Sequence, residues 1–249
     1  GGGANPSDRA VECIATDNRG YGAAANLGFA AARRRGADLI ALVNDDVMVT
    51  PGWLDRLAAE LGGSVGAAQP QLVYASTDPR IVNSLGVALD RYGAGSDIGD
   101  GEPSEPAGAP SDLEIFTGGA VLFRDDFLLE TGGFDERYFL YYEDIDLALR
   151  GRSLGWGYRL VPAAVVEHAR GATTSRDPER TLFLQERNRL WAAFRFAPPL
   201  TILRATWLSL RRLRHQPRDV HRRAVAAGLA GAPRRLAERL RAKNSSSAA

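Results

Sequence analysis

Cysteine is almost absent from this sequence of 249 residues, which contains Cys13 alone. One cysteine cannot form an intrachain disulfide, so a reducing, cytoplasmic setting is favoured. Long apolar runs are absent too, because no stretch reaches the roughly 18 residues that a membrane-spanning helix requires. Residues 1–8 are polar and rich in glycine, without the apolar centre of a secretion signal. We therefore expect no disulfide, no membrane-spanning helix and no signal peptide.

Internal repeats and nucleic-acid-binding motifs are also missing, so we expect no nucleic acid partner. The glycine-rich signature of nucleotidyltransferases is absent near the start, which disfavours that class of enzyme. What remains is an ordinary globular composition, 45% hydrophobic and 24% charged. The length fits one large domain, or a domain with an appendage.

The net charge of +1 conceals a division of the chain into two parts. Residues 198–249 contain 12 basic and 2 acidic side chains, a net charge of +10, whereas residues 1–197 carry −9. A basic segment suits an anionic surface, and an acidic body suits a metal-dependent site. We therefore expect a catalytic domain over 1–197 and a basic helical tail over 198–249.

Apolar runs and helical patterns alternate along the chain, with turn-rich loops between them. The predicted strands are 10–15, 38–43, 65–74, 82–89, 115–123 and 158–161. The predicted helices are 23–35, 51–61, 125–131, 182–196, 200–213 and 229–240. Residues 93–112, rich in Gly, Pro, Asp and Glu, indicate either a solvated surface loop or a segment that covers a site.

An acidic stretch follows four aromatic residues and places Glu143, Asp144 and Asp146 within four positions. A helix that begins near Glu143 accounts for them structurally, because carboxylates suit the positive end of a helix. Alternatively, a carboxylate held against an aromatic wall stays basic enough to take a proton. The residues alone leave both interpretations open.

A second polar group, Asn44-Asp45-Asp46, follows the apolar run 38–43, which we predict to be a buried parallel strand. Ligands of open α/β sheets bind at the carboxyl ends of strands, and hard oxygen ligands suit Mg²⁺ or Mn²⁺. The alternative is an ordinary turn that caps a strand.

Other candidates are weaker and each has a structural alternative. The loop 16–22 runs into a helix start that could hold phosphate, or is a plain connection. Gly118 and Gly119 would let a ligand approach the backbone. Trp156 could stack on a sugar or pack in the core. His168 is a metal ligand or a structural histidine.

In their order and spacing, five motifs resemble family 2 glycosyltransferases of the inverting GT-A class, most closely the bacterial rhamnosyltransferase-type branch. The motifs are Leu42–Val47, Phe116–Ala120, Gly132–Glu136, Gly155-Trp156 and Val161–His168, which surround the acidic stretch of Tyr138–Arg150. The resemblance covers roughly residues 15–196 and implies an α/β fold with a mixed sheet flanked by helices. The first strands of that family, which hold the nucleobase and ribose, have no counterpart here, so we expect an N-terminally truncated domain with an exposed strand edge.

The resemblance also implies roles for individual residues. Asp144 would be the general base, and a Mn²⁺ or Mg²⁺ ion would be held by Asp46 and His168. Asn44 is assigned to the metal as well, although it departs from the strict Asp-x-Asp motif. The remaining assignments are donor binding by Asn18, Gly20, Asn26, Asp45 and Arg187, and acceptor binding by Gly118, Gly119, Glu143 and Trp156. For Arg187 the alternative is a surface salt bridge, and Asp146 is interpreted as structural.

These features predict an inverting transferase that moves a sugar, such as rhamnose, from a nucleoside-diphosphate sugar to a saccharide or polyprenol-linked acceptor in cell-envelope polysaccharide synthesis. Residues 200–213 interleave leucines and Trp207 with arginines, which suits an anionic membrane surface. We therefore expect a peripheral location on the inner face of the cell membrane; the alternative is a helix docked on the catalytic domain. The rival function is a membrane-associated module that binds sugar nucleotides or glycans without catalysis.

Overall fold

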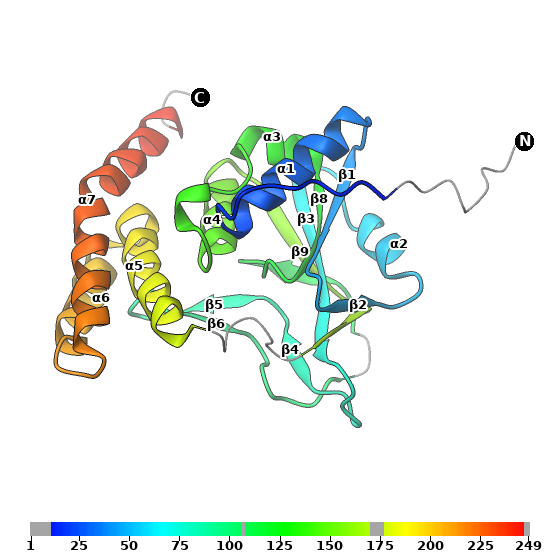
Figure 1. Cartoon of the computed structure of the whole chain (residues 1–249). Coiled ribbons are helices and arrows are strands. Elements are labelled where there is room, and N and C mark those ends of the chain that lie inside the picture. The colour runs from blue at the N-terminus through cyan, green and yellow to red at the C-terminus, as the bar shows by residue number, and fades with distance from the viewer. Residues whose placement is uncertain (1–10, 106–107, 170–176, 247–249) are drawn as a thin grey trace, which may run out of the picture.

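The computed structural model describes residues 11–105, 108–169 and 177–246, with side chains up to 242. Its helices are α1 (Tyr21–Arg34), α2 (Trp53–Ala58), α3 (Asp125–Thr131), α4 (Glu143–Ser153), α5 (Pro178–Phe196), α6 (Pro199–Arg212), α7 (Arg218–Ser246) and the 3-10 helix Glu136–Tyr138. Its strands are β1 (Leu39–Val43), β2 (Val47–Val49), β3 (Val65–Tyr74), β4 (Val82–Ser84), β5 (Val87–Leu89), β6 (Gly95–Asp97), β7 (Ser111–Leu113), β8 (Ala120–Arg124) and β9 (Gly157–His168). Figure 1 shows the resulting arrangement: a sheet with helices on both faces and a group of three helices at one side.

The central sheet is mixed, with strand order β1-β8-β3-β9-β2 and with β4 and β7 attached to β3 and β9. β3 and β9 are parallel, whereas β8 runs antiparallel to both β1 and β3. β5 and β6 form a separate two-stranded antiparallel sheet beside the main one. The long parallel pair brings the carboxyl ends of β3 and β9 together, which is where the site described below lies.

The apolar side chains of β8 alternate between the two faces of the sheet and contribute to an apolar layer on each face. Val121 and Phe123 pack with α1, α3 and α4, while Ala120 and Leu122 pack with Trp53 and Leu57 of α2. Successive side chains of a strand point to opposite faces, so one strand serves both layers. The larger layer is aromatic: Phe116 and Phe127, for example, meet edge to face. This layer is the support against which the start of α4 is held.

The C-terminal helices α6 and α7 pack on the rest of the protein through α5. Arg235 of α7 is buried, 2% exposed, over the rings of Tyr138 and Trp191, and its guanidinium donates to Asp135. Ala205 and Ser209 of α6 are buried. The predicted basic tail is therefore helical as expected, and α7 is docked on the rest of the protein. In the described residues no helix is both long and apolar enough to span a lipid bilayer.

Several sequence predictions differ from the observed elements. The part of the predicted strand 10–15 that the structure describes, residues 11–15, forms no strand and is exposed. The predicted strand 38–43 exists as β1, but it pairs antiparallel with β8 rather than in parallel. The predicted strand 82–89 is divided by Gly86, whose φ of +119° favours glycine. The predicted strand 158–161 continues to His168, because β9 pairs with β3 along most of its length.

Candidate active site

The loop between β1 and β2 brings Asp46 to His168. β2 pairs antiparallel with the end of β9, so that Val47 lies opposite His168, and the Ala169 N–H donates to the Asp46 carbonyl at 2.8 Å. This backbone register places Asp46 Oδ1 3.1 Å from His168 Nε2. Two groups that are 122 residues apart in the chain thus face each other at one edge of the sheet.

Asn83 determines which nitrogen of His168 is free. Its Oδ1 lies 2.8 Å from His168 Nδ1, so in this orientation the Nδ1 nitrogen carries the proton and donates. The lone pair of Nε2 then points at the Asp46 carboxylate, and two acceptors stand 3.1 Å apart. Two facing acceptors need a proton or a cation between them. A metal-binding histidine usually donates its other ring N–H to an acceptor, as His168 donates to Asn83 here.

The metal donors in the described residues are few. No three His, Cys, Asp or Glu side chains gather there into a metal-binding group. Asp46 and His168 therefore offer one oxygen and one nitrogen donor, and the Asn83 contact fixes the ring for this purpose. This set fits an ion that is also held by ligand oxygens, as magnesium or manganese commonly is. Asp45 is exposed beside it.

Tyr21, at the start of α1, connects the loop between β1 and β2 to the loop before β8. Its hydroxyl oxygen lies 2.9 Å from Asn44 Oδ1 and 2.7 Å from the Gly118 carbonyl oxygen. Asn44 is also held through its N–H, which donates to the Gly119 carbonyl at 3.0 Å. Burial, followed by the charges of nearby carboxylates, raises the pKa of Tyr21, so its hydroxyl keeps its proton as a donor. Asn44, Gly118 and Gly119 thus lie together around the Tyr21 hydroxyl, with the Asn44 side chain held by this contact.

Asp144 lies in the first turn of α4 and is held by backbone donors. The Gly118 N–H donates to Oδ2 at 3.0 Å, and the Ile145 N–H donates to Oδ1 at 2.8 Å. Burial raises the pKa of Asp144, although these two hydrogen bonds favour the charged form. A carboxylate with a raised pKa, in a fixed orientation, is suited to accept a proton.

Glu143 is buried, 6% exposed, and its Oε2 has no hydrogen-bond partner in the described part of the chain. Burial, with the neighbouring charge of Asp144, raises the pKa of Glu143. By contrast, Asp146 is paired with Arg150 at 2.6 Å and with Arg195 at 2.7 Å. Asp146 is therefore structural, as the sequence indicated, and the two preceding carboxylates are those that face the site.

The loop before α4 has a strained backbone. Phe139, Tyr141 and Tyr142 have φ values of 69°, 67° and 71°, a region that non-glycine residues rarely occupy. The side chain of Asn188 on α5 holds this loop, because its Nδ2 lies within 2.7–3.0 Å of the carbonyl oxygens of Tyr138, Leu140 and Tyr141. The strain is thus maintained by a buried side chain that directs the loop into α4.

Gly20 fits closely against the same loop. Its φ is +97°, and a Cβ at this position would lie 2.3 Å from the Phe139 carbonyl oxygen. That oxygen accepts a hydrogen bond from the Tyr21 N–H at 2.7 Å, and the Gly20 N–H donates to Asn18 Oδ1 at 3.2 Å. Gly20 is therefore required for the close approach of α1 to the loop before α4, and Asn18 supports the turn that contains Gly20.

Residues 2–192 match the protein family described as "Glycosyltransferase like family 2". The chain belongs to glycosyltransferase family 2. The chain is 31% identical over 205 residues to "N-acetylglucosaminyl-diphospho-decaprenol L-rhamnosyltransferase" of Mycobacterium tuberculosis (strain ATCC 25618 / H37Rv), covering 70% of this chain and 66% of that protein. It is also 31% identical over 211 residues to "Uncharacterized protein y4gI" of Sinorhizobium fredii (strain NBRC 101917 / NGR234), covering 78% of this chain and 22% of that one. It thus spans less than two thirds of either relative.

Among solved structures, GalNAc-T7 with UDP, GalNAc and Mn²⁺ is similar in fold. The TM-score is 0.58 at 14% identity, and the match covers 83% of this chain and 41% of that one. The predicted GT-A-like mixed α/β fold is therefore confirmed, as is the resemblance to rhamnosyltransferases of family 2.

Three residues to which the family resemblance gave ligand-binding roles have structural contacts instead. Asn26 exchanges two hydrogen bonds of 2.9 Å with the backbone of Phe134, which occupies both ends of its amide. Arg187 donates to the Tyr138 carbonyl at 2.7 Å and stacks on Trp191. Trp156 follows the far end of α4, packs on Phe127 and donates to Glu130. For Trp156 the geometry agrees with the core-packing alternative.

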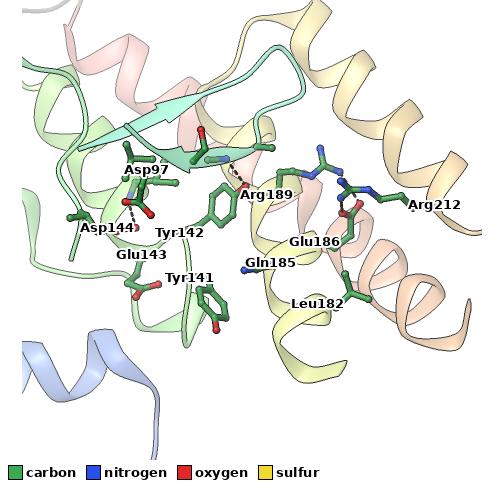
Figure 2. A pocket seen from close by; sticks show the side chains of 16 residues that line it. Asp97, Tyr141, Tyr142, Glu143, Asp144, Leu182, Gln185, Glu186, Arg189 and Arg212 are labelled. Atoms are coloured by element: carbon green, nitrogen blue, oxygen red, sulfur yellow. Dashed lines mark hydrogen bonds and ion pairs between the residues drawn. The ribbon is translucent and has the colours of Figure 1, made fainter. Parts of the chain in front are cut away.

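A cavity of about 720 Å³ lies in front of the carboxylates. Its walls are the loop before α4, the start of α4, the hairpin β5–β6, α5 and the end of α6 (Figure 2). Asp97 of β6 lines it beside Asp144, and Asp97 is among the charges that raise the pKa of Asp144. Sequence patterns do not single out Asp97, because residues 93–112 are predicted to form one loop. The candidate active site therefore includes a third carboxylate.

Proposed function

We propose that this family 2 chain catalyses transfer of a sugar from a nucleoside-diphosphate sugar to a hydroxyl group of the acceptor, with inversion. The observation that carries the proposal is the chain of contacts from Asn44 to Asp144: the Tyr21 hydroxyl shares its proton between Asn44 Oδ1 and the Gly118 carbonyl, and the Gly118 N–H donates to Asp144. These contacts fix the candidate base relative to the loop between β1 and β2, as a reaction between two bound substrates requires. The GT-A-like fold supports it independently.

The proposed chemistry begins with Asp144, which takes the proton of the acceptor hydroxyl as its oxygen attacks the anomeric carbon of the donor. The bond to the diphosphate breaks in the same displacement, and the diphosphate departs on the opposite side. The buried Glu143 binds the acceptor beside Asp144 or orients it. A divalent cation, when bound by Asp46 and His168, neutralises charge on the leaving group.

The acceptor that we propose is a lipid-linked saccharide, and the donor is a nucleoside-diphosphate sugar, with rhamnose as the candidate. The support comes from the relative in Mycobacterium tuberculosis, whose name specifies an L-rhamnosyl group and N-acetylglucosaminyl-diphospho-decaprenol. At 31% identity this relative suggests the substrate class, and the exposed face of α6 agrees with a substrate embedded in a membrane.

Substitution of either Asp46 or His168 by alanine is expected to weaken Mn²⁺-dependent binding of a nucleoside diphosphate by about 10-fold or more. The physical reason is the loss of one of the two protein donors that face each other. Isothermal titration with UDP, GDP and dTDP, with and without Mn²⁺, measures the effect. The exposed His215 replaced by alanine is the control. Unchanged metal dependence in the His168 variant contradicts its role as a ligand.

The exposed face of α6 is expected to hold the protein on an anionic membrane. Leu200, Leu203, Trp207 and Leu210 follow a helical spacing and are each about half exposed or more. Each basic residue near an anionic leaflet adds about 1 kcal/mol of attraction, which salt weakens. We expect Leu203→Glu with Trp207→Glu to reduce co-sedimentation with vesicles of anionic lipid.

Point substitutions are preferable here to removal of residues 198–249. Removal would also take away the buried Arg235 of α7, which donates to Asp135. The exposed Leu129 of α3, replaced by glutamate, is the matched control. Binding that is indifferent to lipid charge, salt and the α6 substitutions contradicts a membrane role for this face.

A further inference from the structure

The cavity in front of Asp144 has a basic end on α5 and α6, which the chemistry proposed above does not use. Arg189 and Arg212 lie there around Glu186, on the other side of Tyr142 from Asp97 and Asp144 (Figure 2). One end of the cavity is therefore lined by carboxylates and the other by guanidinium groups. A ligand that fills this space meets opposite charges at its two ends.

Within the basic end, Arg189 is fixed. It is 2% exposed and donates to Glu186 Oε1 at 2.7 Å, to the Tyr92 carbonyl at 2.7 Å and to Ser209 Oγ at 2.6 Å. Its Nε is buried without a partner among the described residues. Two arginines share the single carboxylate of Glu186, so the cluster keeps one net positive charge.

Arg212 is the accessible member of the cluster. It is the last residue of α6, and its side chain is 36% exposed. Its Nη1 lies 2.5 Å from Glu186 Oε2. A guanidinium has five N–H donors. Among the described residues Arg212 uses its guanidinium only for the ion pair with Glu186, so further donors are available to a ligand. Guanidinium groups bind phosphate oxygens in a bidentate manner, which makes phosphate the anion that this end suits best.

We propose that the basic end binds the phosphate or diphosphate of the acceptor, the group through which its sugar is joined to lipid, and that Arg212 makes the contact. The inference rests on the proposed transferase function. With the sugar hydroxyl at Asp144 and the phosphate at Arg212, the lipid leaves the cavity beside α6, which carries the exposed leucines and Trp207. The donor diphosphate is the other source of phosphate, but its candidate ligands, Asp46 and His168, are not among the lining residues of this cavity.

The test is a binding measurement with two water-soluble probes in the full chain. One is N-acetylglucosamine joined through a diphosphate to a short alkyl chain, and the other is the alkyl glycoside without phosphate. We expect the wild type to bind the first more tightly, and Arg212→Ala to weaken only that binding, by about 10- to 100-fold. Arg212→Lys keeps the charge and is expected to lose less. Arg211→Ala, the adjacent exposed arginine that stacks on Trp207, is the control.

The outcomes separate this proposal from the proposed function. UDP with Mn²⁺ is expected to bind the wild type and the Arg212 variant equally, and a loss there assigns the site to the donor and overturns the inference. Equal binding of the two probes by the wild type, equal weakening of both in the variant, or no binding of the diphosphate probe also overturns it. None of these results bears on whether Asp144 is needed for transfer, which is measured by turnover.

Discussion

Replacing Asp144 by asparagine is expected to lower the rate of sugar transfer by about 10²–10⁴-fold, the usual cost of losing a general base. An amide cannot take the proton of an acceptor hydroxyl. The amide NH₂ would also face one of the two backbone N–H groups that now donate to the carboxylate, from Gly118 and Ile145. Some local rearrangement is therefore expected, whereas donor binding at Asp46 and His168 is expected to persist.

Turnover of the donor in the presence of acceptor measures this effect, and titration with a nucleoside diphosphate shows whether the site is intact. Asp55→Asn is the matched control, because Asp55 is an exposed first-turn carboxylate of another helix, α2. Near-normal transfer by the Asp144 variant removes this residue from the role of base and leaves Glu143 or Asp97 as the candidates.

Replacing Asn188 by alanine is expected to lower the free energy of unfolding by about 2–4 kcal/mol. The two N–H groups of its buried amide are shared among three loop carbonyl oxygens, each hydrogen bond contributes about 1 kcal/mol, and a buried carbonyl left without a donor adds a desolvation cost. Without this amide, the positive φ values of Phe139, Tyr141 and Tyr142 lose their main constraint. Transfer is expected to fall as well, since this loop leads directly into Glu143 and Asp144.

Denaturant or thermal unfolding measures the change. Gln185→Ala, on the exposed side of the same helix α5, is the control for helix propensity and is expected to change stability little. If the Asn188 variant is as stable as this control, the loop is held by its own packing, and the amide contacts contribute nothing measurable.

The motifs that could be predicted from the sequence are those whose functional residues lie close together in the chain. Asn44-Asp45-Asp46 could be placed at a strand end, and Glu143-Asp144 at a helix start, because burial patterns of strands and acidic helix starts are local. β3 and α3 have the predicted bounds, since each is a continuous pattern between clear turns. The helix predicted over 23–35 begins two residues earlier, at Tyr21, directly after the closely packed Gly20, and ends at Arg34.

The remaining features depend on contacts between distant segments. Arg187 was assigned to phosphate because an Arg-Asn pair is frequent in this family, but its direction is set by carbonyl groups of the loop before α4, about 50 residues away. Trp156 was placed near a sugar, yet the length of α4 separates it from Asp144. Asp97 was missed because its position depends on the pairing of β5 with β6 in a segment of low hydrophobicity. Sequence spacing carries no information about such pairings.

Arg235 has a consequence for the order in which the protein is made. It lies in the last helix, yet it is buried against Tyr138 and donates to Asp135, immediately before the loop that precedes α4. During synthesis the carboxylates of α4 leave the ribosome long before this arginine does. The segment that leads into this loop therefore gains the support of Arg235 only after α7 has been released and has docked. A protease that cuts within α7 is expected to inactivate the protein without touching any residue of the candidate active site.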